Sequence, residues 1–332
     1  MTRPAQCLLV LYTGGTIGMQ LGDQGLTPAT GFEARMRDRQ ARDGQRLPSW
    51  YFRELLPPID SASMNQRNWL EMAASIREEV DAGRCDGVLL LHGTDTLAYS
   101  AAALSFLLLG LPVPVLLTGS MRPAGTPDSD AWANLFGAMQ ALHQGLEPGV
   151  QVFFHGKLMH GARLTKLGAA ELDAFAVLPR PRTGPRAPAI APALDYRQSR
   201  RPVSLAVLPL YPGIQAAQVQ ALLDSGVRGL VLECYGSGTG PADDAALLAT
   251  LTAARQRGVV LVAISQCPQG HVEFGVYVYA AGSQLAATGL VSAGGMTREA
   301  ALGKLFALLG AGLDQAQVEH WFALDLCGER AD

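Results

Sequence analysis

The 332-residue sequence lacks the features that mark membrane, secreted and nucleic-acid-binding chains. No apolar run approaches the ~18 uninterrupted residues that a membrane-spanning helix needs, and the apolar stretch after Cys7 is too short for a secretory signal. The five cysteines are scattered and never form a CxxC pair, which favours a reduced, cytoplasmic chain. The formal net charge of −3 does not indicate the basic surface that is typical of nucleic-acid-binding proteins. We therefore expect a globular cytoplasmic protein that binds neither membranes nor nucleic acid.

The common metal and cofactor motifs are also missing. The six histidines show no HExxH spacing and no nearby acidic cluster, so no metal site is expected. The glycine-rich segment TGGTIG, residues 13–18, lacks the GK[ST] ending of a P-loop and the GxGxxG spacing of a dinucleotide site. No GxSxG nucleophile elbow occurs. The sequence therefore predicts no metal and no cofactor.

Short apolar runs rich in Val, Leu and Ile predict buried parallel strands, because they do not alternate with polar residues. These runs are 8–12, 88–91, 113–117, 150–154, 203–208, 230–232 and 259–264. Helical patterns separate them at 66–82, 97–109, 130–144, 215–225, 242–257 and 297–310. The alternation predicts an α/β fold. We expect a doubly wound, mostly parallel sheet of the Rossmann or flavodoxin-like kind in an N-terminal domain, with a smaller α/β C-terminal domain.

A segment rich in proline and arginine, residues 179–202, interrupts this alternation. Its interleaved prolines favour a partly extended, solvated linker over a nucleic-acid-binding patch. The predicted domains are therefore 1–195 and 204–332.

Four predicted strands end in similar sequences, each with Thr or His followed by Gly and polar residues. They are Thr13-Gly14-Gly15-Thr16, His92-Gly93-Thr94-Asp95, Thr118-Gly119-Ser120-Met121 and His155-Gly156-Lys157. Glycine permits a tight turn and lets a ligand approach the backbone. In open parallel sheets the carboxyl ends of the strands lie at one edge, where ligands bind. We therefore expect the four loops to converge on one pocket.

Hydroxyl groups dominate these strand ends, and they suggest nucleophilic catalysis by a threonine. A threonine hydroxyl is a poor nucleophile unless a base takes its proton. Lys166 is the candidate base, because the sequence has only three lysines beside many arginines. Two alternatives stay open on these residues alone. Thr94 and Asp95 would also suit the cap of the following helix, and Lys166 would also suit the surface.

The combination of TGGTIG at 13–18 and HGTDT at 92–96 resembles the bacterial-type L-asparaginase family. The resemblance covers most of the chain and continues in IDSASM (59–64), TGSMRP (118–123), Asp130 with Asn134, RLTK (163–166), LYPG (210–213), YGSG (235–238) and GGMT (294–297). The IGMQ ending of the first motif and the Asp60-Ser61 pair look like the cytosolic type I branch. The resemblance implies hydrolysis of L-asparagine to L-aspartate and ammonia, with minor glutaminase activity as an alternative, by a homodimer or homotetramer.

The resemblance also implies a role for individual residues. Thr16 would be the nucleophile that accepts the acyl group, and Thr94, Asp95 and Lys166 would form a second catalytic group. Ser61 would hold the α-carboxylate of the substrate. The other substrate-binding residues would be Gly15, Gly93, Ser120 and Tyr279, with backbone amides of the glycine turns stabilising the oxyanion.

Two positions depart from the family pattern. Leu26 stands where the family often carries a tyrosine that hydrogen-bonds the nucleophile, and Tyr279 or Tyr277 would replace it. Ala62 follows Ser61 where a hydrogen-bonding side chain is usual, which leaves the preference between asparagine and glutamine open.

Two other functions stay open. The amidase half of a tRNA-dependent amidotransferase shares these motifs, but the near-neutral charge and the lack of extra length disfavour it. A non-catalytic amino-acid-binding module is disfavoured because Thr16, Thr94, Asp95 and Lys166 are all retained.

Overall fold

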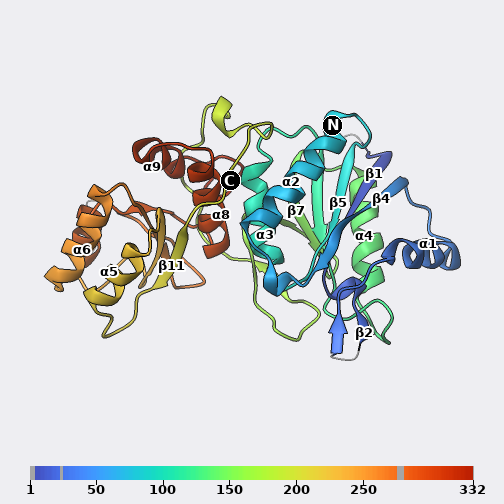
Figure 1. Cartoon of the computed structure of the whole chain (residues 1–332), viewed down its shortest axis with the longest axis horizontal. Coiled ribbons are helices and arrows are strands. Elements are labelled where there is room, and N and C mark those ends of the chain that lie inside the picture. The colour runs from blue at the N-terminus through green and yellow to red at the C-terminus, as the bar shows by residue number, and fades with distance from the viewer. Residues whose placement is uncertain (1–3, 23–24, 275–279, 332) are drawn as a thin grey trace. The chain divides into compact units, whose positions relative to one another are not determined.

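The computed structural model describes residues 4–22, 25–274 and 280–331. The chain forms two compact units, Met1–Val177 and Leu178–Asp332, and each has its own parallel sheet. Figure 1 shows both units coloured along the chain.

The first unit is built on a six-stranded sheet in the order β4-β1-β5-β6-β7-β8. Its parallel strands are β1 (Cys7–Gly14), β4 (Ser49–Ile59), β5 (Gly87–Leu91), β6 (Pro114–Thr118) and β7 (Gly149–Phe154). The edge strand β8 (Lys157–His160) runs antiparallel to β7. Counted along the chain, the parallel strands have the order 2-1-3-4-5, which is the flavodoxin-like form of a doubly wound sheet. The predicted fold class is therefore confirmed.

Helices cover both faces of this sheet (Figure 1). On one face, α1 (Phe32–Asp43) and α4 (Ala131–Gln144) share an apolar core with alternate residues of β1. On the other face, α2 (Gln66–Asp81) packs beside α3 (Leu97–Leu107). The central strands are buried on both sides, which explains why their sequences do not alternate.

Smaller elements extend from the ends of the strands. A short 3-10 helix η1 (Thr16–Gly18) leads into a hairpin of β2 (Gln20–Gly22) and β3 (Gly25–Thr27). A second 3-10 helix, η2 (Ser61–Ser63), follows β4. The strands β9 (Leu164–Lys166) and β10 (Phe175–Val177) form a second antiparallel pair.

The second unit contains a four-stranded parallel sheet in the order β11-β12-β13-β14. The strands are β11 (Leu205–Pro209), β12 (Gly229–Cys234), β13 (Val260–Ser265) and β14 (Val291–Ser292). The helices are α5 (Ala216–Asp224), α6 (Ala245–Gln256), α7 (Ala280–Ala287), α8 (Arg298–Gly310) and α9 (Gln315–Ala323). In this unit α8 is the most completely buried helix, because small and apolar residues occupy almost its whole length.

The proline- and arginine-rich segment 179–202 packs against the second unit. Arg180 is only 7% exposed, and its guanidinium donates to the carbonyl oxygens of Ser265, Cys267 and Met296. Further along, η3 (Pro192–Leu194) forms a single turn. The start of the segment is therefore a fixed part of the second unit and not a solvated linker. The compact units divide the chain between Val177 and Leu178, and the domain limits 1–195 and 204–332 stay a prediction.

Within residues 4–22, 25–274 and 280–331, no helix is long and apolar enough to cross a membrane. The same residues contain no group of three or more side chains arranged to hold a metal ion.

Candidate active site

The candidate site lies where the strand order of the first sheet reverses. β1 and β5 are neighbours, but the chain leaves β1 toward β4 on one side and leaves β5 toward β6 on the other. At such a switch point the connections leave toward opposite sides of the sheet, and ligands of open α/β sheets bind there at the carboxyl ends of the strands. The two loops here are TGGT and HGTDT, the pair that the sequence singled out.

The two loops touch through their glycines. Gly15 has φ of 81°, and a Cβ atom there would lie 2.3 Å from the backbone nitrogen of Gly93. A Cβ atom on Gly93 would lie 2.4 Å from Oγ of Ser61. Because real Cβ contacts are never this short, both positions require glycine. The structure therefore brings Gly15, Gly93 and Ser61 together.

Hydroxyl and amide groups fix these three loops to one another. Thr13 Oγ1 donates to the Leu91 carbonyl at 2.9 Å, and the Gly15 amide donates to the Ile59 carbonyl at 3.1 Å. Thr96 Oγ1 donates to the Ser61 carbonyl at 2.8 Å. Two of the hydroxyls that the sequence highlighted, on Thr13 and Thr96, thus hold the backbone in place.

Lys166 contacts Thr94 and Asp95, two neighbouring residues of HGTDT. Its Nζ donates to Thr94 Oγ1 at 3.0 Å and to Asp95 Oδ1 at 2.8 Å. Thr94 is 5% exposed, and the side chains of Lys166 and Asp95 are 18% and 64% exposed. The buried hydroxyl therefore faces an amine, while the carboxylate beside it remains open to solvent. This arrangement can pass a proton between Thr94 and Lys166 and can still offer Asp95 to a cation.

A buried chain of hydrogen bonds runs from α2 through α3 to HGTDT, and the sequence did not predict it. Trp69 Nε1 donates to Ser100 Oγ at 2.9 Å, and Ser100 Oγ lies 2.8 Å from His92 Nε2. His92 Nδ1 lies 2.6 Å from the Gly93 carbonyl oxygen. Burial lowers the pKa of His92 from 6.5 to about 4, although the bond to Gly93 acts the other way.

The direction of this chain follows from its two ends. A carbonyl only accepts, so the neutral imidazole of His92 carries its proton on Nδ1 and accepts from Ser100 at Nε2. The indole of Trp69 only donates, so Ser100 has its own proton free for His92. One sequence signal existed in hindsight: Ser100 lies eight residues after His92 and is one of two serines in a mostly apolar helix.

The third and fourth strand ends are joined by Asp130 and Asn134. The Asp130 carboxylate accepts from the amides of Met121 and Arg122 at 2.9–3.1 Å. Asn134 donates to the Gly119 carbonyl at 3.0 Å and accepts from the His155 amide at 2.9 Å. These bonds hold the loop of TGSM.

Ser120 belongs to that loop and is fully buried. Its Oγ donates to the Arg122 carbonyl at 2.6 Å, so in this structure its hydroxyl serves the loop itself. The substrate-binding role of Ser120 stays a prediction.

Thr16 begins η1 and is partly buried beside these loops. The hydroxyl of Tyr12 packs against the next turn, where a Cβ atom on Gly18 would lie 2.0 Å from Tyr12 Oη. The same hydroxyl donates to the Ala29 carbonyl at 3.0 Å. Leu26, on the following hairpin, is 49% exposed. The two tyrosines proposed to replace a loop tyrosine, Tyr277 and Tyr279, lie outside the described residues.

The fold and the site together define a class: a doubly wound α/β enzyme whose strand ends present hydroxyl, amine and carboxylate groups at the switch point. The family model of the N-terminal asparaginase domain matches residues 7–196, and that of the glutaminase/asparaginase C-terminal domain matches residues 204–322. The chain therefore belongs to the asparaginase family.

Individual relatives agree with this assignment. L-asparaginase 1 of Escherichia coli K12 is 36% identical over 339 residues, which cover 97% of each chain. The crystal structure of L-asparaginase I from Vibrio cholerae has a TM-score of 0.82 at 32% identity, covering 99% of this chain and all of that one. The thermostable L-asparaginase from Thermococcus kodakarensis has a TM-score of 0.84 at 30% identity, covering 98% and 99%.

Proposed function

We propose that this protein is an L-asparaginase, an amidohydrolase that converts L-asparagine and water into L-aspartate and ammonia. The observation that carries the proposal is the contact of Lys166 Nζ with Thr94 Oγ1 and Asp95 Oδ1, at the switch point of an asparaginase-family fold. A lysine amine hydrogen-bonded to a buried threonine hydroxyl is suited to moving the proton of a hydroxyl nucleophile or of water.

The reaction would proceed in two steps through an ester on Thr16. In the first, Thr16 Oγ1 attacks the side-chain amide carbon, the C–N bond breaks, and the hydroxyl proton leaves with the nitrogen as ammonia. In the second, water attacks the ester carbon, and its proton returns to Thr16 Oγ1 as aspartate departs. Thr94 and Lys166 form the hydrogen-bonded pair that handles these protons.

Substrate recognition would use the groups that surround the two threonines. The Asp95 carboxylate uses Oδ1 for Lys166 and is well exposed, so it suits the α-ammonium group. Ser61, against Gly93, would bind the α-carboxylate. The backbones of Gly15 and Gly93 lie against each other, and backbone amides of these two loops would donate to the oxyanion of the reacting carbonyl.

Several finer proposals rest on the family resemblance. The protein would act in the cytoplasm without a cofactor, as a homodimer or homotetramer. Glutamine would be a slower substrate. Tyr279 would take the place of the tyrosine that Leu26 replaces. A Tyr279→Phe variant that turns over asparagine as fast as the native chain would refute the last of these.

Acyl transfer to hydroxylamine tests the two-step route. When hydroxylamine competes with water, an ester on Thr16 is intercepted, and β-aspartyl hydroxamate forms alongside aspartate. We expect the hydroxamate with the native protein and none with Thr16→Ala. Hydrolysis that continues in Thr16→Ala would show that Thr16 is not the nucleophile. A native chain that releases no ammonia from asparagine would instead favour an amidotransferase or binding role.

A further inference from the structure

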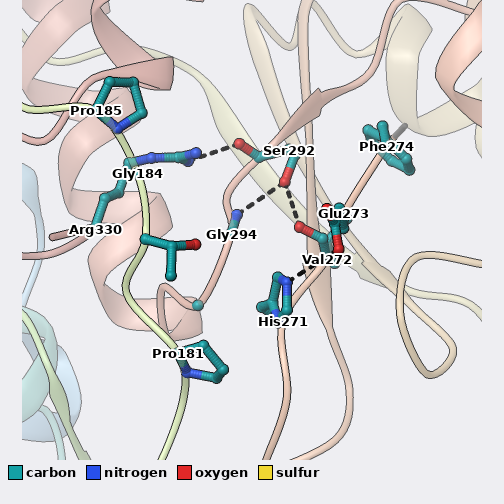
Figure 2. Close-up of a pocket in the computed structure, with 12 residues that line it drawn as sticks. Pro181, Gly184, Pro185, His271, Val272, Glu273, Phe274, Ser292, Gly294 and Arg330 are labelled. Atoms are coloured by element: carbon teal, nitrogen blue, oxygen red, sulfur yellow. Dashed lines mark hydrogen bonds and ion pairs between the residues drawn. The ribbon is translucent and has the colours of Figure 1, made fainter. Parts of the chain in front are cut away.

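The second unit contains a pocket of about 250 Å³, which Figure 2 shows, and its charged groups are already balanced. Arg330 lines the pocket, and the nearby carboxylates of Glu329 and Asp325 offset its charge. Across the pocket, His271 Nε2 lies 3.4 Å from the Glu273 carboxylate. The described part of the lining therefore presents no unbalanced charge that would select a ligand.

In the first unit, Thr96 occupies the N-cap position of α3 but does not cap that helix with its side chain. A threonine at this position normally accepts a hydrogen bond from an amide of its own first turn. Thr297, at the N-cap of α8, does so by accepting from the Ala300 amide at 3.1 Å. Thr96 Oγ1 donates instead to the carbonyl of Ser61, 35 positions earlier in the chain, at 2.8 Å. The Thr96 hydroxyl therefore serves the turn that contains Ser61 and not its own helix.

The turn that receives this hydrogen bond, η2 with the residues that flank it, is rigid within itself. The Ser63 amide donates to the Asp60 carbonyl at 2.9 Å, and the Met64 amide donates to the Ser61 carbonyl at 3.1 Å. The Asp60 carboxylate accepts from the Ala62 amide at 3.1 Å. Because the turn is bonded internally in this way, its position depends on its contacts with the neighbouring loops.

The loops TGGT and HGTDT both hold this turn. On one side, the Gly15 amide donates to the carbonyl of Ile59, just before the turn, at 3.1 Å. On the other side, Gly93 packs so closely that a Cβ atom there would lie 2.4 Å from Ser61 Oγ, and Thr96 supplies the hydrogen bond. The bond from TGGT comes from the backbone, whereas the bond from HGTDT comes from a side chain. A substitution at Thr96 can therefore loosen the turn while the backbone of both loops stays the same.

We propose that Thr96 is a positioning residue that sets the length of the amide substrate, an inference that rests on the proposed function. In that reaction Ser61 would bind the α-carboxylate, and Thr16, which directly follows Gly15, would attack the amide carbon. A turn that is held by both loops fixes the span between these two groups. Glutamine has one methylene more than asparagine, so a fixed span that suits asparagine places the amide of glutamine wrongly for attack. One methylene in a fitted site changes kcat/KM by about 10- to 200-fold.

Steady-state kinetics with L-asparagine and L-glutamine test the proposal in the native chain, Thr96→Val and Thr96→Ser. Valine keeps the branched shape but lacks the hydroxyl. We therefore expect kcat/KM for asparagine to fall about tenfold in Thr96→Val and that for glutamine to fall less, so that the ratio of the two narrows. Serine keeps the hydroxyl and should preserve the native ratio. A purely structural role would lower both values by the same factor and leave the ratio unchanged.

Thr252→Val is the matched control, because Thr252 also donates to a backbone carbonyl, that of Leu248, at 2.9 Å, but lies on α6 of the second unit. This variant should keep the native ratio. Thr96→Ala removes the same hydroxyl and replaces Thr96→Val in the test if the valine variant does not fold. A folded, active Thr96→Val with the native ratio would overturn the role of Thr96 and leave the proposed asparaginase function standing.

Binding of the two products separates the role of Thr96 from the proposed function, because binding needs no turnover. In calorimetric titrations we expect the native chain to bind L-aspartate more tightly than L-glutamate, and Thr96→Val to lose most of this preference. A native chain that releases no ammonia but shows this loss would refute the asparaginase function and support the role of Thr96. A native chain that neither releases ammonia nor binds either product would overturn both.

Discussion

At the scale of single residues, the candidate site depends on side chains that do not touch a substrate as well as on those that would. His92, Ser100 and Trp69 form a hydrogen-bonded chain under HGTDT, and His92 bonds the carbonyl of the glycine that precedes Thr94. Because Gly93 also contacts Gly15 and Ser61, a shift in this chain would reach three parts of the proposed site. We regard His92, Ser100 and Trp69 as positioning residues.

Replacing Ser100 by alanine should therefore impair turnover more than binding. The change leaves His92 Nε2 buried without the hydroxyl that donates to it, which is expected to cost about 1–3 kcal/mol. We expect kcat to fall while KM changes little, and we expect Ser100→Thr to restore kcat because it keeps the hydroxyl. Steady-state kinetics of the two variants decide this, and equal kcat in Ser100→Ala and the native protein would rule out the positioning role.

The neutral state of His92 predicts a dependence of stability on pH. Its pKa of about 4 in the folded chain lies below the ordinary 6.5, so the unfolded chain takes up a proton first as the pH falls. The stability contribution is complete above pH 6.5 and is lost progressively as the pH falls from 6.5 toward 4. The full effect is roughly 3 kcal/mol.

Urea unfolding at pH 7 and pH 4.5 measures this effect against a His92→Gln variant, which does not titrate. The native chain should lose more stability between the two pH values than the variant does. Equal losses in both chains would mean that His92 does not carry this dependence.

At the scale of elements, the sequence predicted the buried strands and the helices that cover them, because apolar composition and periodicity are strongest in buried segments. It missed β4, an edge strand whose exposed residues and two prolines dilute the apolar pattern. It also missed α1, whose sequence is mostly charged and which buries only Phe32 and Met36. The sequence predicts a linker at 179–202, because no pattern in it indicates that Arg180 donates to backbone carbonyls far away along the chain.

The chain's C-terminal segment is joined to α8 by a buried ion pair that the sequence did not reveal. Lys304 and Glu329 are both fully buried, and Lys304 also donates to the carbonyls of Phe322 and Leu324. Burial alone would raise the pKa of Glu329. The charge of Lys304 and the backbone amides that donate to the Glu329 carboxylate lower this pKa to about 2.

Breaking this pair from one side should therefore destabilise the chain strongly. We expect Lys304→Met to lower the free energy of unfolding by about 3–5 kcal/mol, since a carboxylate then stays buried without its partner. The double variant Lys304→Met with Glu329→Leu should lose less than the sum of the two single variants. Denaturant unfolding of all four chains gives the coupling, and strict additivity would show that the two charges do not depend on each other.

At the scale of the whole molecule, the sequence predicted a site at the carboxyl ends of the strands because glycine and hydroxyl residues recur there. The structure brings two of these strand ends, TGGT and HGTDT, into contact, and their catalytic role stays a prediction. The contact of Lys166 with Thr94 joins residues 72 positions apart, and no spacing rule predicts it. It was anticipated from the scarcity of lysine and from the family resemblance. The supporting residues Trp69 and Ser100 had neither signal. A Trp on the buried face of an amphipathic helix and a Ser in a mostly apolar helix usually only fill a core.

The measurement that tests the central claim most directly is ammonia release from L-asparagine and from L-glutamine by the native chain, Thr16→Ala, Thr94→Ala, Lys166→Met and Lys166→Arg. Far-ultraviolet circular dichroism confirms folding in each case. We predict rapid release from asparagine by the native chain and a loss of several orders of magnitude in all four variants, including Lys166→Arg, because a guanidinium cannot give up its proton. Folded Lys166→Arg or Thr94→Ala with native activity would contradict the account, and so would a native chain that releases ammonia from neither amide.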